Sequence, residues 1–196
     1  MQPPPSVLEP GEQELQIISA LGPLQLYLAN RHQFQELSRL VDNAALTADY
    51  VNPATLEEGA LVLAESTGVW HRARITKILP NNFFRVDLFD FDREAEVELN
   101  EIGRVAKDLM KIPVLMRKCA LHSFYGREEE APKSNEKLKS LVAGLETVMG
   151  EVVGEKDGLC LVRIPSLEKK LMERSVPEVS KRHALLEKLK SKKLNS

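Results

Sequence analysis

A dense group of carboxylates marks the middle of this 196-residue sequence, and carboxylates are the side chains that pair with guanidinium and ammonium groups. Residues 83–99 carry a local charge of −4, whereas the whole chain has a formal net charge of only −2. Such a run is typical of a solvated surface. It also fits an acidic rim beside a groove that attracts an arginine- or lysine-bearing peptide. The acidic residues are Asp87, Asp90, Asp92, Glu94, Glu96 and Glu98.

The opposite charge gathers at the C-terminal end of the chain. Residues 168–196 contain nine basic and four acidic side chains, a local charge of +5. This pattern is typical of a solvated helix end, since lysines suit the negative end of the helix dipole. The alternative is an RNA-binding segment, although no aromatic residues interleave with the lysines. Its candidate phosphate contacts are Lys181, Arg182, Lys188 and Lys190.

The remaining reactive residue types do not form a recognisable catalytic or metal site. No two histidines have the HxxxH spacing of a helical metal site, and no GxSxG, P-loop, HExxH or GxGxxG motif occurs. Cys119 and Cys160 lie among apolar residues, which indicates buried thiols in a reducing compartment. We therefore expect no metal, no cofactor and no enzymatic activity. Without a signal-peptide pattern or an apolar run of membrane length, the chain is expected to be soluble and intracellular.

The acidic run belongs to a block of short strands that follows an amphipathic helix expected at 31–46. Short turns separate the strands, so they form a meander, and a meander this small hides its core by curling into a barrel. The expected strands are 60–64, 69–79, 83–89 and 94–99.

The segments on either side of this block are too small to fold separately. Their apolar residues are expected to pack together and make a second lobe from both ends of the sequence. The expected elements are a helical turn or two within 12–21, strands at 24–28 and 114–124, a helix at 138–149, a hairpin of 151–153 with 159–164, a short helix at 167–172, and a basic helix at 180–193.

Four motifs, in order, resemble the extended Tudor domain over residues 20–175. Residues 69–75 (VWHRARI) are similar to its WYRARV strand, and residues 88–93 (LFDFDR) lie where it carries YIDYGN. Residues 109–113 (LMKIP) with 118–121 (KCAL) look like its exit segment, and residues 22–27 (GPLQLY) resemble its entry strand. The resemblance implies an α+β, mainly β fold, in which a Tudor (SH3-like) β-barrel is inserted into a staphylococcal-nuclease-like (OB-type) lobe.

On this resemblance the chain divides into five parts. They are an N-terminal tail (1–20), the first part of the nuclease-like lobe (21–55), the Tudor barrel (56–112), the second part of that lobe (113–178) and a basic C-terminal segment (179–196). The carboxylates and arginines that the nuclease needs for catalysis have no matching cluster here.

The resemblance also implies a function. Extended Tudor domains bind arginine, often dimethylated, in a cage of aromatic rings, because a weakly hydrated guanidinium stacks well on ring faces. They serve as adaptors for Piwi-type Argonaute proteins in germline small-RNA granules, or in other ribonucleoprotein assemblies. The implied partner is an arginine-rich protein segment, and the implied location is cytoplasmic, in ribonucleoprotein granules, with a nuclear location left open.

The positions that match the cage hold few aromatic rings in this sequence. In order they are Glu65, His71, Leu88 (or Phe89, with a shift of one residue) and Phe91; Asp90 and Asp92 flank Phe91, with Asp92 in place of a glycine, and Arg93 stands in place of the rim asparagine. We therefore expect weak or absent methylarginine recognition. Either Glu65, Asp90 and Asp92 bind an unmodified arginine or lysine, or the pocket is inactive and partners bind elsewhere.

Overall fold

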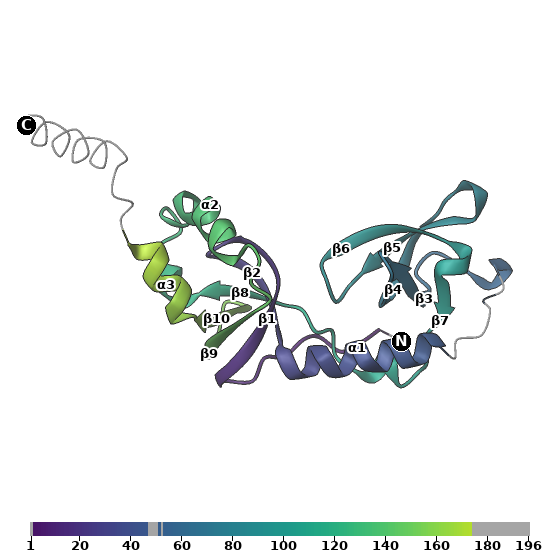
Figure 1. Cartoon of the computed structure of the whole chain (residues 1–196), viewed down its shortest axis with the longest axis horizontal. Coiled ribbons are helices and arrows are strands. Elements are labelled where there is room, and N and C mark those ends of the chain that lie inside the picture. The colour runs from purple at the N-terminus through teal and green to yellow at the C-terminus, as the bar shows by residue number, and fades with distance from the viewer. Residues whose placement is uncertain (1, 47–50, 52, 174–196) are drawn as a thin grey trace, which may run out of the picture.

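The computed structural model describes residues 2–46, 51 and 53–173. Two lobes lie at opposite ends of helix α1 (Arg31–Leu46), which runs between them (Figure 1). The expected basic helix at 180–193, with Lys181, Arg182, Lys188 and Lys190, lies outside the described residues. Within the described part of the chain, no helix combines the length and apolar character needed to span a bilayer.

The first lobe, here named the closed barrel, is built from both ends of the described chain. Its strands close in the order β1-β2-β8-β10-β9, and the apolar side of this barrel is packed against α2 (Ala131–Val142) and α3 (Pro165–Met172). Figure 1 shows both helices lying beside the barrel strands. The strands are β1 (Gly11–Gly22), β2 (Gln25–Asn30), β8 (Arg117–Leu121), β9 (Thr147–Lys156) and β10 (Leu159–Arg163).

The second lobe, here named the meander, is a five-stranded antiparallel sheet in the order β6-β5-β4-β3-β7. Strands β3 and β6 are in contact although they are not neighbours in the sheet, so the sheet curls around its apolar core. The strands are β3 (Leu61–Ser66), β4 (Val69–Ile78), β5 (Phe83–Leu88), β6 (Arg93–Glu98) and β7 (Ile102–Arg104). Short 3-10 turns occur at Pro53–Thr55, Pro80–Asn82, Leu99–Glu101, Leu109–Lys111 and His122–Phe124.

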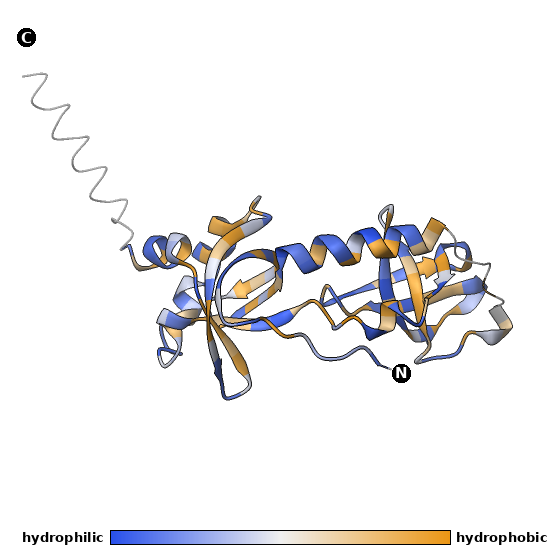
Figure 2. Ribbon diagram, turned by 90° about the horizontal axis from the view of Figure 1, so that it is seen from below, coloured by the Kyte–Doolittle hydropathy of each residue, from blue (hydrophilic) through white to orange (hydrophobic). Residues whose placement is uncertain are grey.

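Helix α1 joins the lobes through a third apolar cluster. The Asn30 side chain accepts a hydrogen bond from the Gln33 amide at 3.1 Å, as an N-cap does. Hydrophobic residues form bands between hydrophilic ones along the helix, as in an amphipathic helix (Figure 2). Its apolar face packs between the two sheets and the segment that leaves the meander, and the buried members of this cluster are Ala29, Leu37, Val41, Leu63, Leu109 and Leu115.

One expected helix was wrong, and another ends earlier than expected. Residues 12–21, expected to contain helical turns within a tail, belong to strand β1, so the tail does not extend to residue 20. Register shifts along β1 break the strict alternation that marks a strand in the sequence. The helix expected at 138–149 ends at Val142, because Gly144 adopts a φ of +80° that stops a helix, and Thr147 already begins β9.

Candidate functional site

The most buried charge in the described part of the chain belongs to Arg72 on β4. Its side chain is 0% exposed, and it forms a two-point ion pair with Asp90, whose side chain is 2% exposed. Nε donates to Oδ2 at 2.9 Å and Nη2 donates to Oδ1 at 2.8 Å. Such a fork is the strongest geometry available to a guanidinium and a carboxylate.

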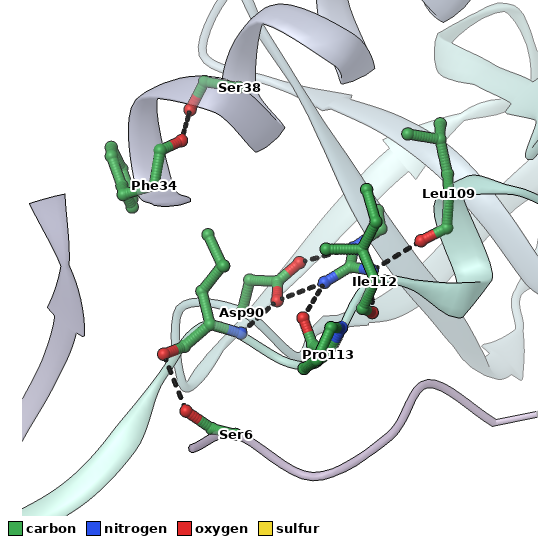
Figure 3. Close-up of polar contacts among 9 residues, drawn as sticks. Ser6, Phe34, Ser38, Asp90, Leu109, Ile112 and Pro113 are labelled. Carbon is green, nitrogen blue, oxygen red and sulfur yellow. Dashed lines mark hydrogen bonds and ion pairs between the residues drawn. The ribbon is translucent and has the colours of Figure 1, made fainter. Parts of the chain in front are cut away.

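The other three N–H groups of Arg72 bind the segment that leaves the meander. They donate to the carbonyl oxygens of Leu109 (2.7 Å), Ile112 (2.7 Å) and Pro113 (2.9 Å). All five guanidinium donors are therefore satisfied within the protein. Figure 3 shows this convergence of the three carbonyls and the carboxylate.

The Asp90 carboxylate is also fully engaged. Its Oδ1 accepts a third bond from the Leu115 amide at 2.9 Å, and the Leu115 carbonyl in turn accepts from Ser6 Oγ at 2.9 Å. The prediction that Asp90 helps to bind a peptide arginine is therefore wrong, because its oxygens face the chain's own Arg72 in the interior. Asp90 holds the exit segment in place instead.

The two alternatives for the third cage position are both occupied by internal contacts. Leu88 is 0% exposed and belongs to the apolar core of the meander. The Phe89 ring lies 5.4 Å from the guanidinium carbon of Arg72, within cation–π range. The aromatic face that a one-residue shift would offer to a ligand thus covers the buried arginine.

Three rings do meet near the remaining cage positions. The His71 and Phe91 rings are 4.7 Å apart at an interplanar angle of 75°, and the Phe91 and Phe34 rings are 5.8 Å apart at 76°. Phe34 comes from α1, where the sequence placed it only in the apolar stripe of a helix. The rings pack edge to face against one another, and His71 is only 7% exposed.

Burial also sets the protonation of His71. Desolvation is the main cause that lowers its pKa below the ordinary value of 6.5, and the nearby Arg93 adds to this, while Asp90 and Asp42 oppose it. Its Nε2 atom is buried and has no hydrogen-bond partner among the described residues. His71 is therefore neutral at pH 7, and it presents a ring to Phe91 rather than a charge.

This shift predicts a loss of stability in mild acid. Above pH 6.5 the imidazole is neutral in both states, but below it the unfolded chain takes up a proton before the folded chain does. The free energy of unfolding should fall as the pH drops below 6.5 and level off below the folded pKa. Urea titrations between pH 7.5 and 5 will measure this. His71→Gln should remove the dependence, whereas the exposed His122→Gln should retain it; equal slopes in all three proteins would contradict the prediction.

The acidic candidates around these rings differ in position. Alternation along the β3–β4 ladder directs Glu65 and Trp70 to one face and Ala64 and His71 to the other, so Glu65 does not share the face of His71. Asp92 is exposed in the turn between β5 and β6, where its φ of +50° lies in the region that the family's glycine would favour. Arg93 is also exposed at this turn.

Helix α1 supplies a further carboxylate that reasoning from the sequence did not select. Asp42 is exposed, acts electrostatically on His71, and lines an open hollow of about 710 Å³ together with Phe34, Ser38 and Arg39. The hollow thus combines an aromatic ring that touches the cage-equivalent Phe91 with a carboxylate about two helical turns further along α1. The helical spacing of Phe34 and Asp42 was the available signal, but it looks like that of an ordinary amphipathic helix.

The arrangement matches known proteins over most of its length. The Tudor domain family matches residues 12–123, and no curated protein sequence matches the chain. The human TDRD1 extended Tudor domain, solved in complex with a symmetrically dimethylated peptide, is 17% identical with a TM-score of 0.59 and covers 82% of each chain.

Two further solved structures show the same fold. Extended Tudor 10-11 of Drosophila melanogaster is 22% identical with a TM-score of 0.59, over 84% of this chain and 48% of that one. Extended Tudor domain TD3 of mouse TDRD1, in complex with a MILI peptide containing dimethylarginine, is 16% identical with a TM-score of 0.57, over 84% and 87%.

The curled meander beside a closed barrel is thus the architecture of the extended Tudor domain. The chain belongs to the Tudor domain family, and the expected fold class is confirmed.

Proposed function

We propose that this chain is a non-catalytic protein-interaction module that recognises an unmodified arginine or lysine in a protein partner, with little or no preference for methylarginine. The observation that carries the proposal is the state of the cage-equivalent positions. Leu88 is in the core, His71 is buried against Phe91, and Phe89 covers the chain's own Arg72. Methylation keeps the arginine charge but removes N–H donors. A methylated arginine therefore binds no better than an unmodified one where aromatic rings do not enclose its guanidinium.

The chemistry that remains accessible is acidic. Glu65 is partly exposed, and Asp42 and Asp92 are exposed, so their carboxylates are open to N–H donors of an incoming side chain. The exposed Arg93 opposes a second positive charge beside His71. We therefore place the peptide's basic side chain toward Asp42 and Phe34 at the hollow on α1, where Asp42 and Glu146 balance the charges of Arg31 and Arg39, rather than toward Arg93.

The proposed setting is a cytoplasmic ribonucleoprotein assembly, with an arginine-rich segment of a Piwi-type protein or another component as partner. It is supported by membership of the Tudor family and by solved relatives that hold MILI and Aubergine peptides. These complexes describe those proteins, and the partner of this chain is part of the proposal.

Calorimetric titration with one arginine-rich peptide in unmodified, symmetric dimethyl and asymmetric dimethyl forms tests the proposal. The unmodified form should bind at least as tightly as the others. Asp42→Asn should weaken binding by up to about fivefold, the effect of losing a solvent-screened ion pair of roughly 0.2–1 kcal/mol. Glu65→Gln should have a smaller effect, because Glu65 does not line the hollow on α1.

Glu129→Gln is the matched control, because Glu129 is an equally exposed acid in the loop before α2 of the other lobe. It should leave binding unchanged. Tighter binding of a dimethyl form would contradict the proposal, and so would the absence of binding by all three peptides.

An RNA mobility shift that disappears when residues 180–196 are deleted would favour the RNA alternative instead.

A further inference from the structure

The two cysteines of the chain, 41 positions apart, are direct neighbours in the closed barrel. Cys119 on β8 and Cys160 on β10 are Cα partners in the parallel ladder that joins these strands. Partners on neighbouring strands lie about 4.8 Å apart and point to the same face of the sheet. That separation is within the range that a disulfide spans. Each thiol also shifts the pKa of the other.

The two sulfurs have different surroundings. Cys119 is 0% exposed, with its thiol 3.4 Å from the Arg117 carbonyl oxygen. Cys160 is 4% exposed and borders a cavity of about 380 Å³ between the N-terminal segment and strands β8 and β9. A small molecule that enters this cavity therefore meets Cys160 first.

Charge in the same cavity favours the Cys160 thiolate. Arg117 and Glu155 both line it, and they form an ion pair of 2.6 Å across its wall. The neighbouring Cys119 side chain lowers the pKa of Cys160, and the Arg117 guanidinium lowers it further, against burial and Glu155. The neighbouring Cys160 side chain, together with burial, raises the pKa of Cys119. Since the thiolate is the nucleophilic form, Cys160, which borders the cavity, is the sulfur that attacks first, and Cys119 reacts second.

We propose that Cys160 is a modification site for small hydroperoxides, and that Cys119 converts the product into a Cys119–Cys160 disulfide. The inference is independent of the proposed peptide recognition, since it concerns the opposite lobe.

The chemistry takes place in two balanced steps. The Cys160 thiolate attacks one oxygen of hydrogen peroxide, an S–O bond forms, the O–O bond breaks, and hydroxide leaves. The Cys119 sulfur then attacks the sulfenic sulfur, an S–S bond forms, and the S–O bond breaks. The departing oxygen takes the Cys119 proton and leaves as water. Both cysteine sulfurs are oxidised, and one peroxide molecule is reduced.

The test exposes the folded full chain to hydrogen peroxide, followed by peptide mapping without reductant. Both free thiols should be lost together, with a cross-linked peptide pair containing Cys119 and Cys160. Cys119→Ser should stop at a sulfenic acid on Cys160 that a cyclic 1,3-diketone traps. Cys160→Ser should leave Cys119 unmodified at the same exposure, and Arg117→Met should slow the loss of thiols several-fold.

The cross-link in the unaltered protein does not depend on any variant folding correctly. A wild-type chain that keeps both thiols, or that oxidises Cys160 without forming the cross-link, overturns the proposal. So does a folded Cys160→Ser protein whose Cys119 reacts as fast as in the wild type.

Discussion

Exchanging Arg72 for methionine is expected to lower the free energy of unfolding by about 3–5 kcal/mol, because it leaves the Asp90 carboxylate buried without its counter-charge. Asp90→Ala should cost a similar amount, since it leaves the guanidinium buried and unpaired. In the Arg72→Met variant, the three backbone carbonyls that Arg72 binds would lose a donor as well. Urea denaturation followed by far-ultraviolet circular dichroism measures both changes.

Two comparisons separate this mechanism from a general effect of losing an arginine. Arg85→Met removes the partner of Glu96 in an exposed pair of the same sheet, and should change stability far less because water screens that pair. The double variant Arg72→Met/Asp90→Leu should be less destabilised than the sum of the single changes, since neither partner is left charged and alone. Equal costs for Arg72→Met and Arg85→Met would refute the assignment.

The same contacts explain how the lobes are held relative to each other. Arg72 and Asp90 belong to the meander, whereas the groups they bind, from Leu109 to Leu115, lead into β8 of the closed barrel. Ser6 ties the N-terminal segment to Leu115 on the other side. The pair thus fixes the start of strand β8 of the closed barrel against the meander sheet. The hollow on α1 lies beside the closed barrel, where Gln16 and Glu146 line it.

Local patterns explain why much of the fold could be predicted from the sequence. The meander strands follow alternation and short turns, and α1 follows a 3.6-residue apolar repeat, so each signal lies within its own element. Strand β1 could not be predicted in this way. It pairs with β9 along its first half and with β2 along its second, and its bulges disturb the alternation.

The site was harder to predict because its decisive contacts are distant in sequence. Asp90 has its partner 18 residues away, and the carbonyls that share Arg72 lie 37–41 residues from it. No local pattern distinguishes an aspartate paired in the interior from one on an acidic rim. Phe34 likewise has the spacing of a core residue, and only the fold brings it to Phe91.

Restoring a tyrosine ring beside Phe91 should create methylarginine binding. In the double variant His71→Tyr/Arg93→Asn, a tyrosine face joins Phe91, and the charge that repels a guanidinium is removed. Glu65 is left unchanged because it points to the opposite face of the β3–β4 ladder. At about 0.5–2 kcal/mol for a cation–π contact, the gain for a symmetric dimethylarginine peptide should be about 0.5–2 kcal/mol, or roughly twofold to thirtyfold in Kd. Leu88 is left unchanged because it is 0% exposed, and a larger side chain there would overpack the core.

A matched variant without rings shows whether aromaticity causes the gain. His71→Leu/Arg93→Asn makes the same change of formal charge and adds apolar surface, but it offers no π-face to the cation. Calorimetric titration should give tighter binding of the dimethyl peptide to the aromatic variant than to the leucine variant, and the aromatic variant should prefer the dimethyl over the unmodified peptide. Equal affinities for the two variants would mean that charge removal alone opens the pocket, and that the cage-equivalent position lies elsewhere than at His71.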